Sequence, residues 1–290
     1  MPTVLRTIAE ARATLGAWRK AHPDARLALV PTMGALHGGH LSLVELAHRH
    51  ADAVVASVFV NPLQFGPGED FERYPRTFDA DLAALDGAGV DYVFAPAVDD
   101  MYPGGATETR ISGGAAAAVL DGAHRPGHFD GVLTVVAKLL NIALPDAAVF
   151  GRKDAQQLFV IEQMVRDLNL PVEIVGAPIS RDPDGLARSS RNVYLSADER
   201  DAALALPRAL RAADAAAARG ADVAGVVAAA RAVITAEERI AADYVEAVDP
   251  ATFTPPAPGY AGKVLVLIAA RVGSTRLIDN ATVMVEGGRE

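Results

Sequence analysis

The chain has 290 residues, of which 51% are hydrophobic and 22% are charged, so it can build a packed core and is not a disordered protein. Its formal net charge of −9, without any cluster of Lys and Arg, argues against a nucleic-acid partner. The absence of cysteine excludes disulfides, thiolate nucleophiles and Cys-based metal sites.

The N-terminal segment begins an amphipathic pattern, with Val4, Leu5, Ile8, Leu15 and Trp18 on one side. It lacks the apolar core of a signal peptide. No uninterrupted apolar stretch approaches the roughly 20 residues that a membrane span needs. We therefore expect a cytoplasmic protein that does not interact with a membrane.

Short apolar runs then alternate with longer amphipathic segments over the first two-thirds of the chain. The runs predict buried strands at residues 27–30, 54–60, 92–94, 147–150 and 172–175. The longer segments predict helices at residues 41–49, 79–85, 132–142 and 156–168. This βα series predicts an α/β fold with a Rossmann-like, doubly wound parallel sheet, which binds ligands outside the carboxyl ends of its strands.

Turn-forming residues interrupt the pattern at residues 180–185. A long alanine-rich helical segment follows, from residue 197 to about 239, and then strand-like runs at residues 244–248, 263–269 and 276–278. We expect residues 1–179 to form the Rossmann-like domain and residues 180–290 to form a smaller C-terminal α+β lid domain.

The segment after the strand at 27–30 reads Val30-Pro-Thr-Met-Gly-Ala-Leu-His37-Gly-Gly-His40 and leads into a helix. Neither a P-loop nor a dinucleotide-binding turn is present. Glycines allow a close backbone approach, a helix start binds phosphate, and His37 and His40 can donate to charge that develops on a phosphoryl group. The H-x-G-H pattern is typical of adenylate-forming and nucleotidyl-transferring enzymes. The alternative is a glycine turn with two solvated histidines.

Polar side chains follow other predicted strands. Asn61 and Gln64 follow the strand at 54–60 and offer amides to a polar substrate that is not a phosphate. Lys153 follows the strand at 147–150 and opens a helix, where a compact positive charge can bind phosphates. The alternatives are an ordinary Asn-Pro turn with a surface glutamine, and a capped helix with solvated charges.

The run Arg188-Ser189-Ser190-Arg191-Asn192 lies just past the expected domain boundary. Its two hydroxyls and two guanidinium groups can reach a polyphosphate. A solvated basic turn is the alternative.

Six segments together resemble the pantoate-β-alanine ligases, also called pantothenate synthetases. They are PTMGALHxGH, FVNPxQF, YPRT, RPGHFxGVxTVVxKL, GxKDxQQ and DGLAxSSRN, in this order over about residues 30–195. The resemblance implies a Rossmann-like domain with a smaller lid domain, a homodimer, and the use of ATP with Mg²⁺. It also implies that pantoate attacks the α-phosphate of ATP to give pantoyl adenylate, and that β-alanine then displaces AMP.

The resemblance further implies which residues act. The catalytic set that holds the triphosphate and the developing charge is His37, His40, Lys153, Ser189, Ser190 and Arg191. The other nucleotide-binding residues are Pro31, Thr32, Met33, Gly151, Asp154, Ser180 and Arg188, with Asp154 on the ribose. The residues assigned to pantoate are Asn61, Gln64, Gln157 and Arg125. No ligands to Mg²⁺ are assigned.

The chain departs from the family pattern at four positions. The family usually has Glu where this chain has Gly38, Asp121 and Arg152, and an apolar residue beside the adenine where it has Arg188. None of these departures removes a catalytic group.

Two other functions remain open at this point. A nucleotidyltransferase could use the same H-x-G-H site, but it would need a second phosphate site, whereas Asn61, Gln64 and Gln157 form an uncharged set. A non-catalytic adenine-nucleotide-binding module would leave Lys153, Ser190 and Arg191 without a purpose.

Overall fold

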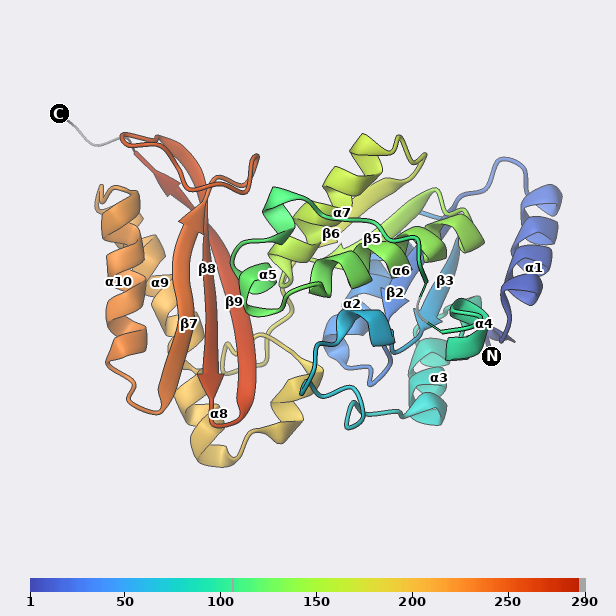
Figure 1. Ribbon diagram of the computed structural model, residues 1–290, viewed down its shortest axis with the longest axis horizontal. Helices are drawn as coiled ribbons and strands as arrows, with labels where there is room; N and C mark the ends of the chain where they lie inside the picture. Colours follow the sequence, from blue (N-terminus) through green and yellow to red (C-terminus); the bar gives the residue numbers. More distant parts are fainter. Residues whose placement is uncertain (106, 287–290) are drawn as a thin grey trace. The chain divides into compact units, whose positions relative to one another are not determined.

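The computed structural model describes residues 1–105 and 107–286, which form two compact units (Figure 1). The first unit comprises Met1–Arg152 and Gln157–Pro178, and the second comprises Lys153–Gln156 and the described residues from Ile179 onward. Within the described residues, no helix has the length and hydropathy of a membrane span. The action of the C-terminal part as a lid stays a prediction.

A parallel sheet lies at the centre of the first unit. Its strands are β1 (Thr3–Leu5), β2 (Leu27–Thr32), β3 (Ala53–Val58), β4 (Tyr92–Phe94), β5 (Ala147–Gly151) and β6 (Glu173–Ala177). They lie in the order β1-β4-β3-β2-β5-β6. The chain moves outward from β2 through β3 to β4 and then returns to the other side of β2, so the winding reverses between β2 and β5. The predicted doubly wound α/β fold is therefore confirmed.

Helices cover both faces of this sheet (Figure 1). They are α1 (Ile8–Ala21), α2 (Gly38–Ala47), α3 (Phe78–Gly87), α4 (Val98–Met101), α5 (Asp121–His124), α6 (His128–Ala143) and α7 (Ala155–Asp167), with 3₁₀ turns η1 (Pro62–Gln64) and η2 (Ala115–Ala117). Successive side chains of a strand point to opposite faces. Leu27 and Leu29 accordingly pack into one core with α1, α6 and α7, and Ala28 and Val30 pack into another with α2 and α3.

Strand β1 is an element that the sequence pattern did not predict. Thr3 pairs with Tyr92 and Leu5 with Phe94 of β4. Val4 and Leu5 belong to the amphipathic pattern of the segment that follows, so the sequence does not separate them as a strand, and the pairing with β4 defines it. Helix α1 begins just after it because Thr7 and Glu10 form a capping box.

The second unit combines helices with an antiparallel sheet, as the predicted α+β composition requires. Its elements are the 3₁₀ turn η3 (Ser190–Tyr194), helices α8 (Ala197–Ala203), α9 (Ala205–Ala218) and α10 (Val223–Thr235), and strands β7 (Ile240–Val248), β8 (Gly262–Val272) and β9 (Thr275–Val285). The strands lie in the order β7-β8-β9. The long helical segment expected from residue 197 to about 239 is thus divided. Gly220 adopts a φ of 82° after α9, and the Asp222 side chain then accepts from the Gly225 N–H at 2.8 Å to cap α10.

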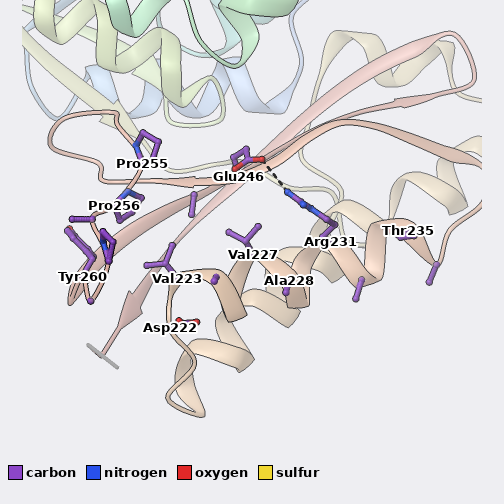
Figure 2. A pocket seen from close by; sticks show the side chains of 17 residues that line it. Asp222, Val223, Val227, Ala228, Arg231, Thr235, Glu246, Pro255, Pro256 and Tyr260 are labelled. Atoms are coloured by element: carbon purple, nitrogen blue, oxygen red, sulfur yellow. Dashed lines mark hydrogen bonds and ion pairs between the residues drawn. The ribbon is translucent and has the colours of Figure 1, made fainter. Parts of the chain in front are cut away.

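A hollow in the second unit is lined mostly by apolar side chains (Figure 2). Val223 and Val227 of α10 line it together with Tyr260 of the proline-rich loop. Its charged groups include the Arg231–Glu246 ion pair, with an N–O distance of 3.2 Å. None of the residues that the sequence predicts for the functional site lines this hollow.

Candidate active site

The reversal of winding separates the carboxyl ends of β2 and β5. These strands pair at Ala28 and Leu29, whereas the pairing of β2 with β3 continues to Thr32 and that of β5 with β6 continues to Gly151. Pro31, which has no N–H to donate, lies in the part of β2 beyond the pairing with β5. The loops after β2 and β5 therefore start where open α/β sheets bind ligands.

A buried carboxylate fixes the path of the loop after β2. Asp81 of α3 is 3% exposed and accepts the N–H groups of Ala35 at 3.0 Å and Leu36 at 2.8 Å. Gly34 has a φ of 81°, and a Cβ at this position would lie 2.9 Å from Asp81 Oδ2. The loop thus depends on a glycine and on a helix distant in sequence to bring His37 to the start of α2.

The two histidines are brought together at the N-terminus of α2. His37 Nδ1 accepts from the Gly39 N–H at 3.1 Å, and His40 Nδ1 accepts from the His37 N–H at 3.3 Å. The ring centroids lie 4.1 Å apart. Because each Nδ1 accepts, a neutral ring carries its proton on Nε2. The sequence thus predicted the helix-start position of both residues, and their action on ATP stays a prediction.

The amides predicted for pantoate lie at η1, after β3. Asn61 caps η1, is 1% exposed, and donates from Nδ2 to Gln64 Oε1 at 3.1 Å. Gln64 Nε2 lies 3.0 Å from the sulfur of Met33, so a predicted pantoate residue and a predicted nucleotide residue are neighbours. A hollow beside them is lined by Met33, Gly34, Phe59 and Asp81, among other residues. The structure therefore joins the loops after β2 and β3 at one edge of the sheet.

Arg125 is held by an acidic partner next to this turn. It donates to both carboxylate oxygens of Glu69, at 2.7 and 2.6 Å, and to the Gln64 carbonyl at 3.3 Å. Burial works to raise the pKa of Glu69, but the hydrogen bonds and charge of Arg125, together with the Gly66 N–H, outweigh it, so this pKa is lowered. Arg125 Nη1 also lies 2.9 Å from His128 Nε2. These contacts give Arg125 a bracing role, and its direct contact with pantoate stays a prediction.

His128 completes this cluster. Burial lowers its pKa to about 4, and the neighbouring Arg125 adds to the effect. The imidazole is therefore neutral at pH 7, with Nε2 accepting from Arg125 and Nδ1 donating to the Gln64 carbonyl at 2.8 Å. Both side chains thus fix the backbone of Gln64.

The predicted residues after β5 lie in the turn that leads into α7. Lys153 and Asp154 lie between the end of β5 at Gly151 and the start of α7 at Ala155. In the second unit, the Lys153 carbonyl accepts from Asn280 Nδ2 at 2.8 Å. Gln157 lies in the first turn of α7.

The serine-arginine run forms a tight turn in the second unit. Ser189 caps η3 by accepting the Arg191 N–H at 3.3 Å. The Arg188 N–H donates to the Ser180 carbonyl at 2.9 Å, so these two predicted nucleotide residues are bonded neighbours. The Arg188 side chain donates from Nε to Asp182 at 2.9 Å.

Comparison with known proteins shows the family to which the chain belongs. The family model described as pantoate-beta-alanine ligase matches residues 3–282. The chain belongs to the pantoate-beta-alanine ligase family. The pantothenate synthetase of Leifsonia xyli subsp. xyli is 58% identical over 258 residues, which are 89% of each chain. That of Thermobifida fusca is 57% identical over 264 residues, 88% of each chain. The resemblance seen in the sequence is confirmed, and the chain is a member of an enzyme family.

Solved structures of the pantoate-beta-alanine ligase family share the fold. The crystal structure of pantothenate synthetase from Thermus thermophilus has a TM-score of 0.89 and 49% identity, covering 96% of this chain and 98% of that chain. The pantoate-beta-alanine ligase of Francisella tularensis, complexed with beta-gamma ATP and beta-alanine, has a TM-score of 0.80 and 32% identity, with 97% of each chain covered.

Three of the residues at which this chain differs from the family pattern lie at helix starts and in a strand-to-helix turn. Gly38 is the first residue of α2, and Asp121 is the first residue of α5. Arg152 donates from Nε to the Gly176 carbonyl of β6 at 3.1 Å, and its guanidinium lies against that glycine. Thr32, predicted to bind ATP, donates its hydroxyl to the Ser57 carbonyl at 2.6 Å. Its contact with ATP stays a prediction.

Sequence analysis missed Asp81 and Tyr102. Tyr102, at the end of α4, donates to Asn61 Oδ1 at 2.7 Å. For Asp81 a signal was present, since a carboxylate four residues before the buried Leu85 lies on the apolar side of a helix. For Tyr102 we find no such signal, because it stands between Asp99-Asp100-Met101 and Pro103-Gly104, a polar stretch that ends in turn-forming residues.

Proposed function

We propose that this protein uses ATP to condense pantoate with β-alanine, giving pantothenate. The pantoate carboxylate attacks the α-phosphate of ATP, and the bond to pyrophosphate breaks to leave pantoyl adenylate. The β-alanine amine then attacks the acyl carbon, loses a proton, and displaces AMP. The observation that carries the proposal is the contact between Gln64 and Met33 in a chain of this ligase family. It brings the uncharged amides of η1 next to the glycine-rich loop after β2, which suits a phosphate.

The phosphate half of the site rests on a helix start with two imidazoles. Negative charge develops on pyrophosphate as it leaves, and fixed donors stabilise such charge. His37 and His40 supply Nε2–H donors beside the N-terminus of α2. By resemblance, Lys153, Ser189, Ser190 and Arg191 act on the same phosphates, and Pro31, Thr32, Met33, Gly151, Asp154, Ser180 and Arg188 hold the rest of the nucleotide, with Asp154 on the ribose.

The acid half of the site rests on amides. An amide can bind hydroxyl and carbonyl oxygens without adding a charge, so the carboxylate of pantoate stays a nucleophile. Gln64 and Gln157 fit this role, whereas a nucleotidyltransferase would need a cation for a second phosphate. Arg125, the guanidinium beside Gln64, is already bound to both oxygens of Glu69. This pairing favours the ligase over the nucleotidyltransferase.

The family resemblance also supports three further parts of the proposal: the use of Mg²⁺, a homodimer and a cytoplasmic location. In the part of the chain that the structure describes, no group of three or more His, Asp or Glu side chains is placed to hold a metal ion. Mg²⁺ would therefore enter bound to the phosphates of ATP. Light scattering on the purified protein tests the homodimer.

Exchange of labelled pyrophosphate into ATP tests the function. We expect exchange that requires pantoate and does not require β-alanine. His40→Ala and Lys153→Ala should each lower it by about 10²-fold or more, because each removes a fixed donor to developing charge. Lys20→Ala, at the exposed end of α1, is the matched control and should have no effect. Exchange that requires another hydroxy acid in place of pantoate would show that this acid is the substrate. If no acid supported exchange, the ligase function would be rejected.

The two glutamines have a separate test. Gln64→Ala and Gln157→Ala should each raise the KM for pantoate and leave the KM for ATP nearly unchanged, because one ligand loses a contact. The reverse pattern would place these residues in the ATP site.

A further inference from the structure

Tyr102 is a buried tyrosine next to the proposed pantoate site. It is 2% exposed, with its ring 6.1 Å from that of Phe59 and with Lys138 Nζ 5.4 Å from its centroid. Burial raises the pKa of its hydroxyl well above the usual range, so the hydroxyl stays protonated. It donates to Asn61 Oδ1 at 2.7 Å. A buried, permanently protonated donor therefore acts on a residue of the site.

The carboxamide of Asn61 is fully engaged within the protein. Its Oδ1 accepts from the Tyr102 hydroxyl and, at 3.3 Å, from the Leu63 N–H. Its Nδ2 donates to the Gly131 carbonyl at 3.1 Å and to Gln64 Oε1 at 3.1 Å. These partners use the two donor and two acceptor positions of a primary amide. Asn61, with 1% exposure, consequently cannot flip without leaving buried polar groups unpaired.

The orientation of Asn61 determines that of Gln64. Because Asn61 Nδ2 occupies the oxygen of the Gln64 amide, the NH₂ end of Gln64 points to Met33, with Nε2 3.0 Å from the sulfur. A thioether is a weak acceptor, so an oxygen of a bound acid replaces it favourably.

The backbone of this turn is fixed from α6. A Cβ at Gly131 would lie 2.1 Å from the Leu63 carbonyl oxygen, so the close approach of α6 to η1 requires glycine. His128 also donates to the Gln64 carbonyl at 2.8 Å. Because the backbone of Gln64 is fixed, only its side-chain amide can still rotate. The hydrogen bond from Asn61 fixes the orientation of that amide.

We propose that Tyr102 is a positioning residue that acts through Asn61 to present the NH₂ group of Gln64, as a donor, to an acceptor oxygen of pantoate. This inference rests on the proposed role of Gln64 in binding pantoate. It assigns Asn61 to positioning as well, since the four hydrogen-bonding positions of its side chain are occupied by the protein.

Tyr102→Phe removes the hydroxyl and keeps the ring against Phe59. Asn61 Oδ1 then retains the Leu63 N–H, and the amide of Gln64 is less firmly held. We expect the KM for pantoate in pyrophosphate exchange to rise about fivefold, as for loss of one buried hydrogen bond, with the KM for ATP unchanged. Tyr92→Phe in β4, a half-buried tyrosine, is the control and should change neither KM.

A double-mutant cycle separates positioning from general support of the fold. In a Gln64→Ala background, Tyr102→Phe should have no further effect on the pantoate KM, because the group that it positions is gone. An equal fivefold rise in both backgrounds would overturn the proposal, since Tyr102 would act independently of Gln64. An unchanged pantoate KM in Tyr102→Phe alone would overturn it too, and would leave the ligase function standing. Absence of pantoate-dependent exchange in the unsubstituted protein would overturn both.

Discussion

Arg188 stands where the ligase family usually has an apolar residue, and an acidic side chain fixes it. Its Nε donates to Asp182 Oδ1, and Asp182 also accepts from Arg200 at 2.8 Å. The bond from Arg200 and then that from Arg188 lower the pKa of Asp182, so the carboxylate is charged at neutral pH. The arginine therefore has a fixed counterion, which limits where its guanidinium can lie.

We expect Arg188 to contact bound ATP by placing its guanidinium plane on the adenine. Stacking of this kind is worth on the order of 1 kcal/mol, which is about fivefold in affinity. Arg188→Ala should raise the KM for ATP about fivefold, whereas Arg188→Met, which restores an apolar wall, should leave it unchanged. Equal ATP KM values in the three proteins would show that the arginine is a bystander.

Single side chains could be predicted from the sequence where the chemistry follows a strand directly. The positions of His37, His40, Asn61 and Gln64 could be predicted in this way, because strand ends and helix starts are local features. The partners of these residues could not. Asn61 meets Tyr102 through a bond that spans 41 residues, and such pairings depend on tertiary packing.

The loop between β2 and α2 depends on one residue of α3. Asp81→Asn keeps the size of the side chain but leaves an NH₂ group facing one of the two N–H groups of Ala35 and Leu36. We expect the free energy of unfolding to fall by about 2 kcal/mol, as for a lost hydrogen bond to a charged group, and the KM for ATP to rise. Urea denaturation and steady-state kinetics measure the two effects.

The control for this loop is Asp79→Asn, an exposed residue in the first turn of the same helix. It makes the same change of charge without a bond to the loop. A similar loss of stability in both variants would trace the effect to helix charge and not to the loop.

The start of α6 should make stability depend on pH. His128 has a pKa of about 4 in the folded protein, against 6.5 in an unperturbed side chain. Below pH 6.5 the unfolded chain therefore binds a proton that the folded chain does not, so stability falls as the pH drops from 6.5 toward 4. The loss should be roughly 2 kcal/mol between pH 7 and pH 5. Of the charged groups facing His128, Arg125 opposes its protonation, and Glu69 and Asp121 favour it.

His128→Gln removes this titration and can still donate an N–H to the Gln64 carbonyl. Urea denaturation at pH 7 and pH 5 should show a smaller difference in this variant than in the unsubstituted protein. His124→Gln, an exposed histidine of α5, should keep the full difference. Should His128→Gln keep the full difference as well, other groups would be responsible for the acid sensitivity.

Helices could be predicted from the sequence where their apolar pattern is long and regular. The helices of the βα series were found because their apolar periodicity extends over several turns, as in α6 with its buried face. The division of the alanine-rich segment was not, because alanine favours helix throughout and the interruption depends on Gly220 and Asp222. Such boundaries are set by single capping residues.

For the complete chain, the fold class could be predicted because βα repetition admits few arrangements. The order of strands could not, since β1 joins the sheet beside β4 through pairing that its own sequence does not reveal. The family resemblance came from six separated segments. One lies after β2, two lie between β3 and α3, one covers the start of α6, one follows β5, and one leads into η3.

The most direct test of the ligase chemistry follows one oxygen atom. Pantoate with ¹⁸O in its carboxylate should transfer one labelled oxygen to AMP, because that oxygen bonds to the α-phosphate in the adenylate and leaves with AMP when β-alanine attacks the acyl carbon. Mass spectrometry of the nucleotide product should show singly labelled AMP, in amounts equal to the pantothenate formed. Labelled inorganic phosphate with ADP, or AMP without label, would contradict a pantoyl adenylate and with it the assigned reaction.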